Sequence, residues 1–63
     1  MGSAFEEGEY VRLVFPHRTG AAVYHARIVD GPDRDERYTV KVRVSRGVYG
    51  EPYRTHASNI RKR

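Results

Sequence analysis

The stretch YTVKVRVSRG, residues 38–47, carries side chains that could do chemistry at a regular spacing. Valines occupy every second position from Val40 to Val44, and Lys41 and Arg43 lie between them. Because successive side chains of a strand point to opposite faces, this spacing predicts one apolar face and one cationic face. A cationic strand face can contact phosphate groups, or it can serve only solubility and protection against edge pairing.

Positive charge is concentrated in the second half of the chain. The 63 residues include 12 Lys and Arg against 8 Asp and Glu, which gives a net charge of +4. Residues 37–63 hold eight of these bases and one acid, Glu51. Ten of the 12 bases are arginine, which suits bidentate phosphate contacts and stacking on rings. This distribution favours a polyanionic partner.

We therefore expect nucleic acid, either DNA or RNA, to bind the cationic face with limited sequence specificity. Most of the expected contacts are to phosphate, and one aromatic side chain would stack on a base. The proposed nucleic-acid-binding residues are Arg27, Lys41, Arg43, Arg46, Tyr49, Arg54, Arg61, Lys62 and Arg63. A single basic strand is more often a solvated face, so the interpretation depends on the charge of the whole second half.

Composition argues against several other classes of function. A chain this short buries a small core, which leaves little stability for a deep catalytic cavity. There is no cysteine, the three histidines match no zinc spacing, and no serine shows the general base and orienting group that a catalytic serine needs. We expect no enzyme activity, no cofactor, no metal and no small-molecule substrate. Without an apolar run of membrane length or a signal peptide, we expect no membrane partner and an intracellular location, cytoplasmic, nucleoid or nuclear.

Period-two patterns predict an all-β chain of five strands near residues 10–15, 22–29, 37–44, 51–54 and 60–62. Turn chemistry separates them at residues 16–20, 30–36 and 45–50. Residues 55–59 predict one tight 3₁₀ turn before the last strand. We expect a flexible N-terminal segment at residues 1–7, followed by one domain at residues 8–63 with a basic C-terminal tail.

The hydrophobic pattern also predicts which residues lie opposite each other. Matching apolar to apolar positions across both hairpins turns Tyr24, Tyr38 and Tyr53 towards the core. The same register places Arg54 on the outer face beside Lys41. The expected cross-strand pairs are Ile28–Tyr38, Ala26–Val40, Tyr24–Val42, Val44–Glu51 and Val42–Tyr53.

This order of elements resembles a small five-stranded SH3-like barrel. Gly8 with YVRL, then GAAVYHARIV, RYTVKV, GEPYR and a terminal NIR, is similar to the Tudor and agenet pattern over residues 8–61. KOW-type barrels would look similar. The resemblance implies a second function, a protein- or peptide-interaction module whose aromatic cage would draw on Tyr10, Phe15, Tyr49 and Tyr53. A third interpretation is a small assembly or structural protein of a phage or mobile element.

Overall fold

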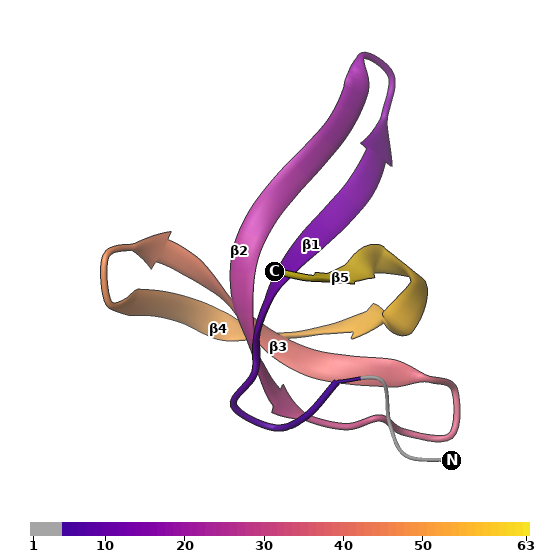
Figure 1. Cartoon of the computed structure of the whole chain (residues 1–63), viewed down its shortest axis with the longest axis vertical. Coiled ribbons are helices and arrows are strands. Elements are labelled where there is room, and N and C mark those ends of the chain that lie inside the picture. The colour runs from indigo at the N-terminus through magenta and orange to yellow at the C-terminus, as the bar shows by residue number, and fades with distance from the viewer. Residues whose placement is uncertain (1–4) are drawn as a thin grey trace.

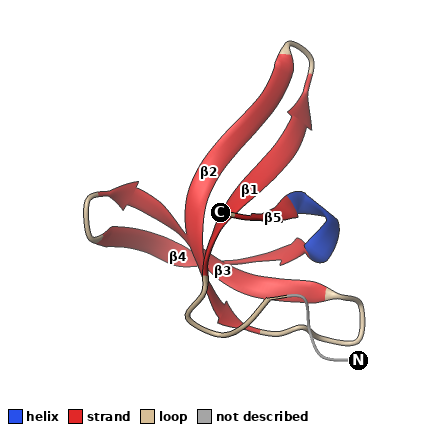
Figure 2. Cartoon of the chain, viewed as in Figure 1, coloured by secondary structure: helices blue, strands red, loops and turns tan. Residues whose placement is uncertain are grey.

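The computed structural model describes residues 5–63 and shows an all-β chain. The strands are β1 (Tyr10–His17), β2 (Gly20–Asp30), β3 (Arg37–Ser45), β4 (Val48–His56) and β5 (Ile60–Lys62). One 3₁₀ turn, η1 (Ala57–Asn59), lies between β4 and β5 and is the helical segment in Figure 2. The predicted all-β class, five strands and 3₁₀ turn are confirmed. Residues 1–4 of the predicted flexible segment lie outside the described residues.

All five strands belong to one antiparallel sheet, in the order β4-β3-β2-β1-β5. The β1–β2 hairpin extends away from the other strands, and β5 returns beside the first half of β1 (Figure 1). Within residues 5–63, β4 and β5 are the two edges of this sheet, and it does not close. The closed barrel that the sequence predicted is therefore not confirmed.

The strands run further into the predicted turns than the pattern indicated. β3 and β4 are joined by two residues, Arg46 and Gly47, so residues 48–50 belong to a strand and not to a turn. Gly47 has a φ of +74°, a conformation that glycine adopts without steric cost. This tight connection adds three residues to the start of β4, and Thr55 and His56 extend its end, so the strand is 9 residues long and not the four predicted.

The predicted register is wrong by two residues in both hairpins. Val40 lies opposite Ile28 on one side and opposite Tyr53 on the other, and Ala26 lies opposite Val42. In the first hairpin, the compact turn at residues 33–36 and a bulge between Ile28 and Asp30 displace the pairing. In the second hairpin, the two-residue turn of Arg46 and Gly47 places the centre of the hairpin one residue earlier in the chain than predicted. An even displacement keeps side chains on their predicted faces, except where one-residue shifts interrupt the pairing after Ile28 and on either side of Arg43.

The core lies on one face of the sheet and includes Phe5, which contacts Tyr38 edge to face with ring centroids 5.4 Å apart. The buried hydrophobic residues are Phe5, Val11, Leu13, Ala26, Ile28, Tyr38, Val40 and Ile60. Tyr38 is buried as predicted, whereas Tyr24 and Tyr53 are 46% and 48% exposed, so their predicted core positions are wrong. Both point to the inner side, but they pack on the half-buried Phe15 beyond the buried core.

Candidate functional site

The outer face of the sheet carries a row of three side chains across three strands. Tyr10 on β1 lies opposite Arg27 on β2, and Arg27 lies opposite Lys41 on β3. Their chain neighbours Val11, Ala26 and Val40 are buried, so the strand alternation turns this row away from the core. The alternation of "VKVRV" thus produces the predicted cationic face, and β1 adds an aromatic ring to it.

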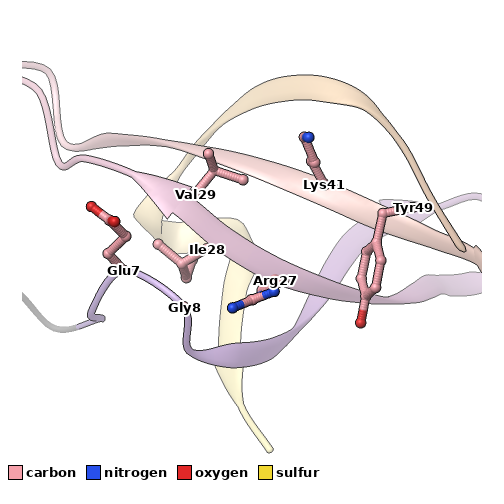
Figure 3. A pocket seen from close by; sticks show the side chains of 7 residues that line it. All are labelled: Glu7, Gly8, Arg27, Ile28, Val29, Lys41 and Tyr49. Atoms are coloured by element: carbon pink, nitrogen blue, oxygen red, sulfur yellow. The ribbon is translucent and has the colours of Figure 1, made fainter. Parts of the chain in front are cut away.

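A pocket of about 480 Å³ opens along this row. Its lining, shown in Figure 3, consists of Glu7, Gly8, Arg27, Ile28, Val29, Lys41 and Tyr49. Glu7 lies at one end and Tyr49 at the other, with the two cationic side chains between them (Figure 3). This volume is within the range of small-molecule and cofactor sites in proteins. The structure thereby brings three of the predicted binding residues, Arg27, Lys41 and Tyr49, into one place.

The wall at the Glu7 end is formed by backbone that pairs with β2. The Gly8 N–H donates to the Ile28 carbonyl at 2.8 Å, and the Ile28 N–H donates to the Glu9 carbonyl at 2.9 Å. Gly8 has a φ of +86°, and a Cβ there would lie 3.7 Å from an Nη of Arg27. That distance is an ordinary van der Waals contact, so the positive φ, and not room for the guanidinium, is what favours glycine here.

The charge of the pocket favours an anion. Neither Arg27 nor Lys41 has a carboxylate partner within 4.0 Å among residues 5–63. The Arg27 guanidinium lies 5.6 Å from the centre of the Tyr10 ring, which fixes it without neutralising it. Glu7 supplies one negative charge against these two positive charges. The arrangement can hold a phosphate beside Arg27 and Lys41, with an aromatic surface at Tyr49 within the same pocket.

Arg43 and Arg46 extend the cationic face beyond the pocket. Arg43 lies opposite Tyr49 on the neighbouring strand, and Arg46 is exposed in the turn that follows β3. In the described part of the chain, neither forms a salt bridge. Both therefore add positive charge in the β3–β4 hairpin, on the Tyr49 side of the pocket.

The remaining predicted residues are occupied by contacts within the molecule. Arg54 forms an ion pair with Asp33, and Lys62 contacts Glu9 at 3.2 Å while its ammonium lies 5.4 Å from the Phe5 ring centre. Arg61 donates to the carbonyls of Ser58 and Ile60. Arg63 lies 5.9 Å from the centre of the Tyr10 ring, at the edge of the row that includes Arg27.

The two carboxylates in these ion pairs are stabilised in their charged form. A hydrogen bond from the Arg37 backbone N–H lowers the pKa of Asp33 most, helped by the Asp35 N–H and by Arg54. The Glu6 backbone N–H lowers the pKa of Glu9 most, followed by the hydrogen bond from Lys62. Both carboxylates thus act as fixed negative partners that hold Arg54 and Lys62.

Five residues that line or flank the pocket were absent from the predicted binding set, and one of them, Ile28, was predicted in the core instead. Tyr10 has a sequence signal, because its position opposite Val11 and Leu13 in the alternation places it on the cationic face. Glu7, Gly8 and Val29 have none, since they precede the first strand or occupy a bulge that only the fold creates.

A second group of aromatic side chains lies on the other face of the sheet. Phe15 packs against Tyr24 and Tyr53, with ring centroids 6.1 and 6.3 Å apart. Two of the four residues proposed for an aromatic cage, Phe15 and Tyr53, are therefore neighbours. The other two, Tyr10 and Tyr49, belong to the cationic face.

The described part of the chain shows neither a metal-binding cluster nor a membrane-spanning helix. Residues 5–63 contain no group of three or more His, Asp or Glu side chains placed to hold a metal ion. No helix in the described range has the length and apolar character needed to span a membrane. Comparison with protein-family models, with curated proteins and with solved structures gives no match for this chain.

Proposed function

We infer that this protein is a nucleic-acid-binding domain that uses the outer cationic face of its sheet. The observation that carries this proposal is the pocket in which Arg27, Lys41 and Tyr49 meet. Two cations with no carboxylate partner among the described residues can neutralise phosphate and release counterions. Most of these contacts reach the backbone of the nucleic acid, which accounts for limited sequence specificity. The partner is DNA or RNA, and the chain acts by binding and not as an enzyme.

The proposed architecture is that of an SH3-like domain of the Tudor, agenet or KOW type. Supporting it are the five antiparallel strands, the 3₁₀ turn between β4 and β5, and the pairing of the last strand with β1. Closing the sheet would require β4 and β5 to exchange backbone hydrogen bonds. A backbone NMR measurement of cross-strand contacts between these two strands tests this proposal directly.

Titrating DNA and RNA of mixed sequence at several salt concentrations tests the binding proposal. We expect affinity to fall steeply as salt rises, with a slope near −0.9 per neutralised phosphate on duplex DNA. The Lys41→Glu variant should weaken binding strongly. Arg34→Glu is the matched control, because it makes the same charge change in the exposed turn after β2. An equal loss in both variants would mean that net charge, and not this face, binds the polyanion.

The aromatic cluster of Phe15, Tyr24 and Tyr53 favours a second candidate function, the binding of a protein or peptide. Tyr24 and Tyr53 are each about half exposed although they point to the inner side of the sheet. Aromatic side chains of this kind are enriched where proteins meet. Retention of a protein partner at high salt that is lost in Tyr53→Ala, and kept in Lys41→Glu, would favour this function over the first.

A further inference from the structure

We propose that the pocket between Gly8 and Tyr49 accepts one unpaired nucleotide of a single strand. This inference rests on the proposed nucleic-acid function and goes beyond it, because the cationic face alone does not distinguish a single strand from a duplex. The base stacks on the Tyr49 ring, and the phosphate attached to it lies beside Arg27 and Lys41. The phosphates that follow reach Arg43 and Arg46.

The pocket combines two cations and an aromatic ring around one open hollow. A surface that only tracks a duplex backbone needs cations and no hollow, since the phosphates lie on the outside of the helix. Here a cavity of about 480 Å³ lies between the cations and carries an aromatic ring at one end. Tyr49 is half-buried and lies opposite Arg43, so its side chain belongs to the cationic face. An aromatic surface next to cations is the arrangement by which proteins hold unstacked bases.

The charges at the two ends of the pocket determine the direction in which a bound strand leaves it. Glu7 lies at the end of the pocket away from Tyr49, and a carboxylate there repels phosphate (Figure 3). Arg43 and Arg46 lie on the Tyr49 side, in the second half of β3 and in the turn after it. The strand therefore passes from the pocket over the β3–β4 hairpin and avoids Glu7. Glu7→Gln removes the repulsion and should raise affinity a few-fold.

Fluorescence anisotropy with a short labelled single strand, its duplex of equal length and polyphosphate tests this inference. We expect the single strand to bind on the order of 10-fold more tightly than the duplex, because a paired base must first be unstacked. Tyr49→Ala should lower single-strand affinity by about 5- to 150-fold, as loss of a stacked base does. The salt slope should stay unchanged, since no charge is removed, and affinity for polyphosphate should also stay unchanged.

Two more variants separate stacking from loss of structure. Tyr49→Phe keeps the aromatic face and should retain most of the affinity, whereas Tyr49→Leu keeps the bulk and should lose it. The thermal midpoint of each variant shows whether the fold is intact. In the wild type, the Tyr49 ring protons should move upfield in an NMR titration with the single strand.

The outcomes that contradict the proposals differ. If duplex and single strand bind equally and Tyr49→Ala has no effect, while Lys41→Glu weakens both, the pocket inference is wrong and the proposed function stands. If no polyanion binds with salt sensitivity, both are wrong. If a free mononucleotide binds as tightly as the oligonucleotide, the pocket is a small-molecule site and the single-strand assignment is wrong.

Discussion

Arg27 and Lys41 differ from Arg54 and Lys62 in what surrounds their charges, although the sequence gives all four the same predicted function. The first two line the pocket and have no carboxylate partner among residues 5–63. The second two form ion pairs with Asp33 and Glu9, and Lys62 also lies over the ring of Phe5. The carboxylate beside each of these cations offsets its charge and weakens its attraction for phosphate.

This difference shows that net charge is a poor count of available contacts. The second half of the chain has a strong positive excess, yet two of its bases are neutralised by acids of the first half. The charge that a ligand meets depends on which cations the fold leaves without partners. In this molecule the two groups differ because Asp33 and Glu9 are each fixed by backbone hydrogen bonds.

We expect the largest effect on nucleic-acid affinity, where loss of the unpaired cations should matter more than loss of the ion-paired cations. Arg27→Gln with Lys41→Gln, and Arg54→Gln with Lys62→Gln, each remove two positive charges. We expect the first pair to weaken binding to nucleic acid severely and to reduce the salt slope by about 2, because two phosphate contacts disappear. The second pair should change affinity little. Titration at several salt concentrations measures both quantities.

Each double variant serves as the control for the other. Net charge is the same in the two double variants, so any nonspecific attraction falls equally in both. Equal losses of affinity would show that the paired and unpaired cations are equivalent and that the comparison is wrong. A loss confined to the second pair would move the interface to the end of the sheet near Asp33.

The next effect concerns stability and tests whether the pocket cations are also structural. Val40 and Lys41 are neighbours on β3, and Val40 is fully buried. Val40→Ala should cost about 1–3 kcal/mol through lost burial and a cavity. Lys41→Ala should leave the unfolding free energy nearly unchanged, because the side chain makes no salt bridge in the described structure. Urea unfolding measures both, and equal losses would show that Lys41 supports the fold.

Much of the fold could be predicted from the sequence, because strand alternation is a local property. The five strands, the 3₁₀ turn and the two faces follow from period two and turn residues. The register could not be predicted, since it depends on a bulge after Ile28 and on hydrogen bonds around Asp33. Tyr24 and Tyr53 lie on the face that was predicted for them. Their exposure could not be predicted, because it depends on how far the buried core extends along the strands.

The candidate site was predicted in part for the same reason. Arg27 and Lys41 could be placed on one face by alternation, whereas Tyr49 was predicted in an exposed turn. The register shift between Lys41 and Arg43 places Tyr49 opposite Arg43, and the structure groups all three residues in the pocket. The ion pairs could not be predicted, because they join residues 21 and 53 positions apart in the chain. Such contacts arise from the tertiary fold, and no local pattern of charge indicates them.

The smallest expected effect is on the acid stability of the ion-paired group. The pKa of Asp33 in the folded chain lies below its ordinary value of 3.8, chiefly because the Arg37 backbone N–H donates to its carboxylate. The folded state thus favours the deprotonated carboxylate, so this stabilisation is present above about pH 3.8 and is lost as pH falls further. Asp33→Asn should lower the thermal midpoint at neutral pH, and the difference from wild type should shrink on acidification.

The Arg54→Gln variant separates the effect of the ion pair on Asp33 from the effect of the backbone hydrogen bonds. This variant removes the ion pair but keeps both backbone hydrogen bonds to Asp33, from Asp35 at 2.9 Å and from Arg37 at 3.0 Å. Exposed ion pairs contribute little to stability, and the Arg54 side chain is 62% exposed. Its midpoint should therefore lie much closer to wild type than that of Asp33→Asn at neutral pH. Glu9 titrates in all three proteins, so comparing their melting curves isolates Asp33. Should Arg54→Gln instead reproduce the whole loss, the ion pair and not the turn would hold this end of the sheet.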